Sequence, residues 1–386
     1  MDRILSTHVG SLPRPQALIA MMLAQQAGRA VDAAAYDAEV RRAVDDVVGR
    51  QLALGIDIVA DGEESKASFV AYVNDRLGGF EPLPPGSGPV GTSFDGSREH
   101  RAFPEFYAAH GQGRVPGSRP PRRVCTGPVT YRGQAQVAAD IANLRHALAR
   151  SPGVAAFMPA ASPASIEGWN RNAYYKNAED YVHAIAEAMR EEYRAIIDAG
   201  LLLQIDDPRI TSHYVVNPDV SIAEARKFAE LRVEALNHAL RGIPEEKVRH
   251  HTCYGINMGP RVHDMELKDI ADIVLKVNAG AYSFEAANPR HEHEWRVWEE
   301  ARLPEGKTLI PGVISHTTVL VEHPELIADR LERYAKVVGR DHVIAGADCG
   351  FASHPSADPE IHPTIVWAKL EALVAGARIA SRRLWR

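Results

Sequence analysis

The architecture of the chain can be predicted from the stretch Gly55-Ile-Asp-Ile-Val-Ala-Asp-Gly-Glu-Glu64. A helix is expected before it, at residues 33–54, because apolar residues recur there at helical spacing: Val40, Val44, Val47 and Leu52. The glycine ends this helix as a C′ residue would, a short buried strand follows, and the strand ends in an acidic loop. The same order recurs at residues 181–208, where the segment after the helix reads Gly200-Leu-Leu-Leu-Gln-Ile-Asp-Asp-Pro208.

Strands alternate with helices along the whole chain. We predict strands at residues 4–12, 57–60, 123–130, 154–159, 201–206, 247–253, 282–285, 309–314 and 343–345. Further helices are predicted at residues 138–149, 181–199, 222–240, 267–279, 324–338 and 363–384. This alternation is typical of βαβ units, and an α/β fold with a single (β/α)8 TIM-type barrel over residues 1–386 fits best. Nine candidate strands exceed the eight of that fold, so one of them is expected to lie outside the barrel.

Residues 80–123 interrupt this alternation. The segment is rich in proline and glycine, shows little periodicity, and mixes polar and aromatic side chains at residues 95–110. Irregular segments of this length in a compact domain are usually functional lids or disordered. The aromatic residues favour a packed excursion: Phe103, Phe106 and Tyr107. We therefore predict a long Pro/Gly-rich insertion in the barrel, and a lid over the site is one role that would suit it.

The composition excludes several classes of protein. A formal net charge of −6 leaves no basic surface for binding the phosphates of nucleic acid. The N-terminal residues do not form a secretory signal, and no apolar run approaches the roughly 20 residues that span a bilayer. Three cysteines argue against a disulfide framework and for a reducing compartment. A cytoplasmic protein without nucleic-acid or membrane partners is therefore expected, and the sequence leaves a homo-oligomer open.

A candidate metal site begins in the segment Arg249-His-His-Thr-Cys-Tyr-Gly255. His251 and Cys253 are two residues apart at the end of a predicted strand, so their side chains point to the same face and can hold one ion. Glu285 and Cys349 follow two later strands in the same way. In such barrels these strand ends meet at the face where active sites lie. One imidazole, two thiolates and one carboxylate suit Zn²⁺, so we predict a zinc site.

Each candidate ligand also has a purely structural interpretation. Cysteine is commonly a small buried hydrophobe, which is the role expected of Cys125. Glu285 also suits an ion pair within the barrel. His250 is expected to point away from the site because it neighbours His251 in a strand. The cluster His291-Glu-His-Glu294 looks like a second metal motif, but a solvated helix face is the expected state of these residues.

Six short segments carry a resemblance to a known family: Thr7-His-Val-Gly-Ser11, Asp61-Gly-Glu63, Thr126-Gly-Pro-Val-Thr130, Gln204-Ile-Asp-Asp-Pro208, His251-Thr-Cys-Tyr254 and Asp348-Cys-Gly350. Together and in this order, they resemble the catalytic half of cobalamin-independent methionine synthase, in the superfamily of barrels that also contains uroporphyrinogen decarboxylase. The resemblance covers almost the whole chain. The large N-terminal half of the long plant and bacterial enzymes has no counterpart, so the chain is similar to a short, core-type member.

The resemblance implies a zinc ion held by His251, Cys253, Glu285 and Cys349. In the family, the zinc binds the thiol of homocysteine as a thiolate, which attacks a methyl group on a tetrahydrofolate. The thiolate is the nucleophilic form of a thiol, and a bound metal cation removes the thiol proton. The resemblance therefore implies a zinc-dependent S-methyltransferase that joins homocysteine and a folate-type donor and forms methionine.

The resemblance also implies a substrate site. Glu63 and Asp206 stand where the family binds the ammonium group of homocysteine, which needs groups that only accept hydrogen bonds. Gly10 and Ser11 stand where the family meets the substrate carboxylate. The competing structural interpretation of the two acids is a salt bridge with arginines of the barrel.

One segment departs from the family pattern. Where methionine synthases have an aspartate and a histidine after a Gly-Val strand, this chain has Gly312-Val-Ile-Ser-His-Thr-Thr318. Ser315 takes the place of the aspartate, and His316 is one position from the histidine. His316 is the candidate proton donor to the departing alkyl carrier, since histidine titrates near neutral pH. The change leaves the identity of the alkyl donor open.

Three other functions compete with this one. An epoxyalkane:coenzyme M transferase has a similar short barrel and opens an epoxide with a zinc thiolate; its sulfonate needs arginines, for which Arg14, Arg209 and Arg261 are candidates. It needs no acceptor for an amino group, so Glu63 with Asp206 favours an amino-acid thiol. A uroporphyrinogen decarboxylase-like enzyme would need several arginines and no H-x-C set. A non-catalytic zinc protein would use a closed four-ligand site, whereas ligands on separate barrel strands favour catalysis.

Overall fold

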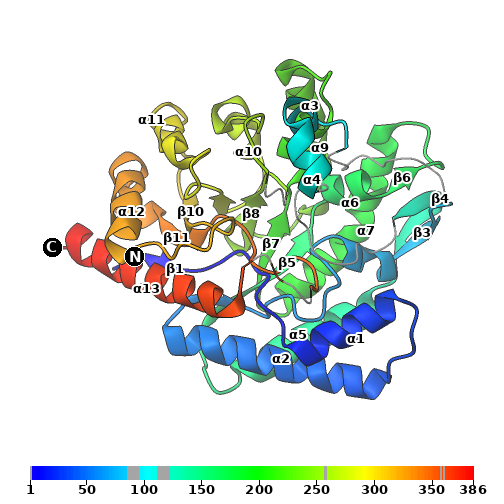
Figure 1. Ribbon diagram of the computed structural model, residues 1–386, viewed down its shortest axis with the longest axis horizontal. Helices are drawn as coiled ribbons and strands as arrows, with labels where there is room; N and C mark the ends of the chain where they lie inside the picture. Colours follow the sequence, from blue (N-terminus) through cyan, green and yellow to red (C-terminus); the bar gives the residue numbers. More distant parts are fainter. Residues whose placement is uncertain (1, 85–94, 111–121, 256–258, 357–358, 360) are drawn as a thin grey trace.

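The computed structural model describes residues 2–84, 95–110, 122–255, 259–356, 359 and 361–386. Eight parallel strands form its central sheet (Figure 1). They are β1 (Leu5–Ser6), β2 (Ile58–Ala60), β5 (Ala155–Ala161), β7 (Leu202–Asp206), β8 (Val248–Thr252), β9 (Ala281–Phe284), β10 (Thr308–Ile314) and β11 (Ile344–Ala347). Their order across the sheet is β1-β11-β10-β9-β8-β7-β5-β2, so strands that follow one another in this set are neighbours. The predicted α/β barrel is confirmed.

The sheet curls into a nearly closed barrel. β1 pairs in parallel with β11, and the amide of Thr7 donates to the carbonyl oxygen of Ala345 at 2.9 Å. A parallel bridge between Thr7 and Ile58 connects the same segment to β2, at the other end of the strand order. The segment that begins with β1, at one end of the strand order, therefore also contacts β2 at the other end, and this nearly closes the ring.

Apolar side chains fill both sides of the barrel wall. Val59 of β2 belongs to the main core, whereas its two neighbours belong to a second, smaller cluster. This smaller cluster contains residues of four strands: Ile58, Ala60, Phe157, Ile310 and Ile344. Successive residues of a strand point to opposite faces. Because the helices cover the outer face, the smaller cluster fills the interior of the barrel.

Long helices cover the outside of the barrel (Figure 1). They are α2 (Ala33–Leu54), α5 (Gln134–Leu148), α7 (Ala178–Asp198), α9 (Ile222–Ala239), α12 (Pro324–Val338) and α13 (Pro363–Leu384), and each lies within a few residues of its predicted position. The side chain of Asp32 accepts from the amide of Ala35 at the start of α2. Gly55 ends α2 in the left-handed conformation, with φ of 82°, as predicted.

The ninth candidate strand lies outside the barrel. β4 (Arg123–Tyr131) pairs antiparallel with β3 (Leu77–Pro82) and parallel with the short β6 (Arg171–Asn172), and the three form a separate sheet. Toward its end, side chains of β4 alternate between more and less exposed. This pattern is typical of a sheet that is covered on one face only, unlike the strands of the barrel.

One predicted helix is wrong. Residues 267–279 contain only the short η3 (Leu267–Asp269) and α10 (Ala271–Val274), because Ile270 between them has a non-helical φ of −134°. Several short elements were not predicted: α1 (Gln16–Gln26), η1 (Ala71–Asp75), α6 (Pro163–Trp169), α8 (Arg209–Val216), η2 (Glu245–Lys247), η4 (Glu292–Arg296), α11 (Val297–Glu300) and η5 (Arg340–His342). Most span fewer than three turns, so apolar periodicity does not reveal them.

The predicted insertion at residues 80–123 is described in part. Residues 85–94 and 111–121 lie outside the described residues, so the lid predicted there stays a prediction. Between them, α3 (Arg98–Ala102) and α4 (Pro104–His110) form two short helices in place of an irregular segment. Arg98 donates to the carbonyl oxygen of Tyr214 at 3.0 Å, and Tyr107 is buried. The expectation that the insertion packs against the rest of the protein is therefore confirmed for residues 95–110.

The first and last parts of the described chain lie side by side (Figure 1). The amide of Ile4 donates to Ser381 Oγ on α13 at 3.0 Å. α13 in turn packs against α12 and the adjoining strands. No helix in the described part of the chain combines the length and the apolar character that crossing a bilayer requires.

Candidate metal centre

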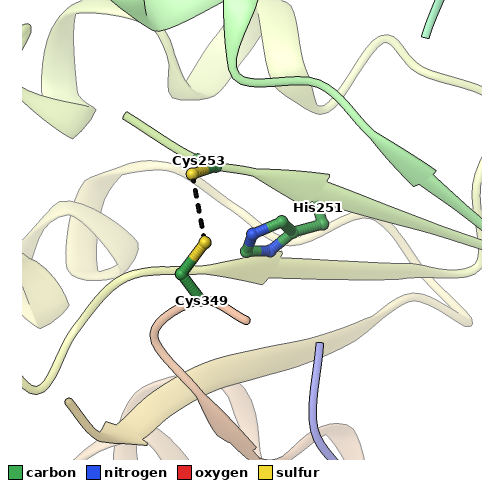
Figure 2. A group of neighbouring side chains, drawn as sticks. All are labelled: His251, Cys253 and Cys349. Atoms are coloured by element: carbon green, nitrogen blue, oxygen red, sulfur yellow. Dashed lines mark hydrogen bonds between the residues drawn. The ribbon is translucent and has the colours of Figure 1, made fainter. Parts of the chain in front are cut away.

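Two thiols and an imidazole meet at the carboxyl ends of β8 and β11 (Figure 2). Cys253 Sγ lies 3.3 Å from Cys349 Sγ, and the two sulfurs and a ring nitrogen of His251 all lie within 4.8 Å of one another. His251 belongs to β8 and Cys253 directly follows it, so the strand pleat brings both side chains to one side. Cys349 comes from the turn after β11. All three side chains are buried.

The donor atoms of this cluster fit a zinc ion. His251 Nε2 is buried and has no hydrogen-bond partner among the described residues, whereas Nδ1 lies 3.1 Å from Ser283 Oγ. This arrangement leaves one ring nitrogen free for a metal while a neighbour orients the other. Burial lowers the pKa of His251 well below its usual value, and nearby His250, Arg249 and His316 lower it further. The ring is therefore neutral, which is the form that binds metals, and two sulfurs with one nitrogen are typical zinc donors.

The Cys349 thiol holds its proton when no cation is near. The contact with Cys253, followed by burial and the charge of Glu285, raises the pKa of Cys349 well above its usual value. A divalent cation between the sulfurs would reverse this effect, because it favours the thiolate form. The cluster therefore has the electrostatics of a site that ionises when a metal binds.

Glu285, the fourth predicted ligand, lies at the edge of this cluster, directly after β9. Its Oε1 is 4.0 Å from Cys253 Sγ and 3.4 Å from the amide nitrogen of Tyr254. Its Oε2 accepts hydrogen bonds from Arg261 at 2.7 Å and from Asn288 at 2.9 Å. Glu285 thus forms the ion pair that was its structural alternative, and it presents one oxygen toward the thiols.

A pocket opens beside the two thiols. Its walls are formed by loops and strand ends: Val9, Ser11, Glu63, Phe69, Asp206, Pro208, His251, Cys253, Gly255, Cys349, Gly350 and Ser353. Three of the four predicted substrate residues, Ser11, Glu63 and Asp206, therefore face the same space as the metal cluster. Gly10, Glu285 and His316 do not line this pocket.

Two buried acids face the pocket. Glu63 has a left-handed backbone, with φ of 57°, and its Oε2 has no partner among the described residues. Asp206 Oδ1 accepts from Gln204 at 2.7 Å. Burial raises the pKa of Asp206 well above its usual value, and the charge of Glu63 raises it further. Burial also raises the pKa of Glu63, although Lys66 and Arg14 oppose this. A bound cation would stabilise such a pair of acids.

The turn at Gly10 and Ser11 lies against these acids. Gly10 has a φ of 139°, and a Cβ atom added there would lie 2.6 Å from Glu63 Oε1 and 2.7 Å from Pro159 Cγ. Only glycine fits this position without displacing its neighbours. Ser11 Oγ lies 3.4 Å from Ser353 Oγ. The chain therefore approaches Glu63 closely at Gly10 and turns Ser11 into the pocket.

The three arginines considered for a sulfonate differ in their contacts. Arg14 donates to the carbonyl oxygen of Glu63 at 2.7 Å, so it holds the backbone and does not form the salt bridge considered for this acid. Arg261 pairs with Glu285 and with Asp264, the latter at 2.7 Å. In contrast, Arg209 Nε and Nη1 have no acceptor in the described part of the chain.

His316 lies beside Glu285. It is buried, and neither ring nitrogen has a partner among the described residues. Ligand atoms of His316, Glu285 and Asp348 lie within 4.8 Å of one another. Burial lowers the pKa of His316 to about 4, although the charge of Asp348 opposes this, so the ring is neutral at neutral pH. Asp348 Oδ1 accepts from the amides of Ala286 and Ala287 at 2.7 and 2.8 Å and so anchors the turn after β9.

A buried polar network around His291 was not predicted. His291 Nδ1 lies 2.7 Å from Glu294, and its Nε2 lies 3.3 Å from Asp264. Both His291 and Glu294 are buried, so the solvated face expected for them is wrong. Charged groups are buried where they are paired. The partners Asp264 and Arg261 come from a distant loop, which local sequence patterns do not indicate.

Two other expectations are confirmed. Cys125 is buried in β4, outside the metal cluster, and its Sγ donates to the carbonyl oxygen of Gly127 at 3.3 Å. His250 Nε2 lies 3.4 Å from Asp207 Oδ2, away from the thiols. Neither residue belongs to the group that could hold a metal.

Replacement of Ser283 by alanine is expected to weaken zinc binding about tenfold. The change removes the oxygen that contacts His251 Nδ1, so the ring loses the partner that orients it. Competition with a chromophoric chelator would measure the affinity. Ser283→Thr keeps a hydroxyl and should bind zinc like the wild type; equal affinities in all three proteins would contradict the orienting role.

A family model described as "Cobalamin-independent synthase, Catalytic domain" matches residues 4–87 and 122–363. The match includes all barrel strands and every residue of the metal cluster and the pocket. It omits residues 88–121, which lie within the insertion predicted from the sequence.

The chain is also similar to individual proteins along nearly its whole length. It is 23% identical to the methionine synthase of Sulfurisphaera tokodaii over 399 residues, which covers 98% of this chain and 93% of the relative. It is 24% identical to the methionine synthase of Thermococcus kodakarensis, with 98% and 94% covered. A solved B12-independent methionine synthase from Shewanella sp. W3-18-1, in complex with selenomethionine, superposes with a TM-score of 0.73, 22% identity and 99% of each chain covered. This last likeness bears on the fold.

Proposed function

Because the chain belongs to the family of cobalamin-independent methionine synthase catalytic domains, we propose that it is a zinc-dependent thiol alkyltransferase. In its most specific form, the proposal is that the chain methylates the thiol of homocysteine and forms methionine, with a folate-type compound as the methyl donor. One observation carries it: a single small pocket is lined by two thiols, an imidazole and two buried acids.

The proposed zinc ligands are His251, Cys253 and Cys349, with Glu285 as the fourth. A bound zinc ion would supply the positive charge that holds a substrate thiol as a thiolate, the nucleophilic form. Glu285 is suited to give way to that thiol. Its Oε2 is already held by Arg261 and a neighbouring amide, so the carboxylate keeps its partners when Oε1 moves.

Glu63 and Asp206 are the proposed ligands of the substrate ammonium group. Burial makes both acids costly to ionise, and an ammonium group between them would compensate for that cost. The hydroxyl of Ser11 and the backbone at Gly10 are proposed to bind the substrate carboxylate. Since Ser11 and both acids share a pocket with Cys253, these contacts would direct the substrate sulfur toward the thiols.

His316 is proposed to act on the leaving group. The nitrogen of a folate-type donor gains a proton when its methyl group departs. A neutral imidazole has one N–H donor and one acceptor nitrogen, so it can pass a proton on while it stays uncharged. No described residue occupies either ring nitrogen, which leaves both for a substrate or a solvent molecule.

Calorimetric titration with three thiols tests the proposed substrate. Homocysteine is expected to bind the zinc-loaded protein about tenfold or more tightly than 4-mercaptobutyrate, which is homocysteine without its amino group. Coenzyme M is expected to bind more weakly than homocysteine for the same reason. A preference for coenzyme M would replace the proposal with epoxide opening. Equal affinity for all three thiols would show that Glu63 and Asp206 do not bind the substrate ammonium group.

Glu63→Gln and Asp206→Asn are each expected to raise the KM for homocysteine about 10- to 100-fold, with a smaller change in kcat. Each substitution removes a charge-assisted hydrogen bond to the ammonium group and leaves the metal cluster in place. Steady-state kinetics would measure both constants. The affinity for 4-mercaptobutyrate should not change, and a parallel loss for both thiols would assign the acids a structural role instead.

We further propose that residues 1–386 act as one barrel unit in the cytoplasm. A reducing compartment would keep the free thiols of Cys253 and Cys349 available for a metal. The pairing of the first barrel strand, β1, with the last, β11, supports a single domain.

A further inference from the structure

The guanidinium of Arg209 lacks the acceptors that its nitrogens need. Arg209 begins α8 and is only 6% exposed, yet no acceptor within the described residues reaches its Nε or Nη1. Buried polar groups in native proteins are nearly always hydrogen-bonded, and an unpaired charged group is especially costly. Burial accordingly lowers the pKa of Arg209 to about 10. A ligand is therefore expected to supply the missing acceptors.

Neighbouring positive charges add to the cost of burying the Arg209 guanidinium without acceptors. The Cζ atoms of Arg209 and Arg232 lie 5.3 and 3.7 Å from the ring centroid of Phe228, and the positive charge of Arg232 lowers the pKa of Arg209. The acid that compensates them is Glu167, but both of its carboxylate oxygens accept from Arg232, at 2.9 and 2.6 Å. Arg122 adds a third positive charge near Arg209. Both oxygens of Glu167 thus accept from Arg232, and neither serves as an acceptor for Arg209 Nε or Nη1.

A second unpaired donor lies in the same cluster. Trp169, the last residue of α6, is buried, and its Nε1 has no acceptor in the described chain. Arg122 stacks over its ring, with Cζ 4.9 Å from the centroid. α6 packs against α8 and α9, which carry Arg209 and Arg232. Donors without acceptors therefore come from two adjacent helices.

The cluster lies at the same end of the barrel as the thiol pocket. α6 follows β5 and α8 follows β7, so both helices begin beyond the carboxyl ends of barrel strands. Pro208, the residue before Arg209, belongs to the pocket wall, as does Asp206. A molecule that enters this end of the barrel would meet both sites.

We propose that Arg209, Arg232, Arg122 and Trp169 form a binding site for an oxyanion, either a carboxylate or a phosphate. Such a group brings negative charge and several acceptor lone pairs for Arg209 Nε and Nη1 and for Trp169 Nε1, which have no acceptor among the described residues. The proposed function suggests the source: the charged groups of homocysteine already have partners, so the anion is carried by the alkyl donor. Only this last step rests on the proposed function.

Thermal unfolding with inorganic phosphate and with glutarate, each compared with sodium chloride at equal ionic strength, tests the site. A saturable rise in the Tm of the wild type by about 2 °C or more is expected. Arg209→Met should show no such rise. Without added oxyanion, this variant should be at least as stable as the wild type, because it lacks the buried unpaired charge. Calorimetry should show at least about tenfold weaker phosphate binding.

Two further variants complete the experiment. Arg29→Met removes an exposed arginine between α1 and α2, so it changes net charge equally and should keep the full response to phosphate. Arg209→Lys keeps the charge without the planar group and should respond weakly, which provides a test should Arg209→Met not fold. Absence of a saturable response in the wild type would overturn the proposal, and so would an equal response in Arg209→Met.

A titration with 5-methyltetrahydrofolate separates the two sources of the anion. Competition between phosphate and this compound, together with weaker binding to Arg209→Met, would identify the carboxylates of the donor. Phosphate binding that depends on Arg209 but leaves the folate unaffected would identify a free anion. Zinc content and homocysteine affinity should be unchanged in Arg209→Met. The failure of this proposal is therefore distinguishable from failure of the proposed function.

Discussion

Cys253→Ala and Cys349→Ser are each expected to lower the affinity for zinc more than about 100-fold and the transfer activity about 10³-fold. The two sulfurs lie 3.3 Å apart, and each substitution removes one donor from a set that needs four for tetrahedral zinc. Under the proposed function, loss of the metal would remove several kcal/mol of charge stabilisation from the reaction. Metal analysis of purified protein should find about one zinc per wild-type chain and almost none in the two variants.

Cys125→Ala is the matched control. This thiol is equally buried but lies in β4, outside the metal cluster. The control should keep its zinc and its activity, which would show that loss of a buried thiol is not in itself damaging. Zinc retained in the Cys253 and Cys349 variants, with unchanged activity, would refute the proposed metal centre.

Arg76→Met is expected to lower the free energy of unfolding by about 3–5 kcal/mol, because it leaves buried acids without their cation. Arg76 binds Asp140, and its Nη1 lies 3.1 Å from Glu192 Oε2. Glu192 also accepts from the hydroxyls of Tyr72 and Tyr131, each at 2.7 Å. These contacts connect β4 and η1 to α5 and α7. Chemical denaturation would measure the loss, and the exposed Arg42→Met should show no resolvable change.

The cost of Arg76→Met is expected to depend on pH. Burial alone would raise the pKa of Glu192, but Arg76, Lys66 and the two tyrosine hydroxyls hold it below its usual value. A lowered pKa contributes stability above the unfolded-state value of about 4.3, and this stability is lost as the pH falls through the folded-state value. Without Arg76, burial should raise the pKa of Glu192. The free energy of unfolding of the variant should therefore fall furthest below that of the wild type at neutral pH, where Glu192 is ionised. Its deficit should therefore shrink between pH 7 and pH 4, and a constant deficit would contradict this account.

The barrel could be predicted because its signals are local and repeat along the chain. A glycine such as Gly55 ends a helix, and a short apolar run such as β2 follows it. Both signals can be recognised without knowledge of tertiary contacts. The nine candidate strands could not be sorted in the same way. β4 looks like a barrel strand in the sequence, and only its antiparallel pairing with β3 places it in a second sheet. Partner choice depends on tertiary contacts, which local pattern does not contain.

The residues of the site could be located, but their partners could not. Strand ends indicated that His251, Cys253 and Cys349 meet, since parallel strands deliver such residues to one face. For Glu285, the sequence left open a choice between metal ligand and ion pair. The structure shows an ion pair of its Oε2 with Arg261, which lies 24 residues away in a loop with no periodic pattern, while its Oε1 faces the thiols. The sequence also could not predict that Arg209 lacks acceptors, because the presence or absence of an acceptor depends on tertiary contacts.

The spread of the metal cluster along the chain has a consequence for how the protein is made. Cys253 and Cys349 are 96 residues apart, so a ribosome exposes the first thiol well before it has translated the second. The turn that carries Cys349 is held by β11, and β11 pairs with β1 from the other end of the chain. The complete ligand set therefore exists only after translation has passed β11 and the newest strand has met the oldest. Binding of the proposed metal by the complete ligand set would therefore require a finished barrel.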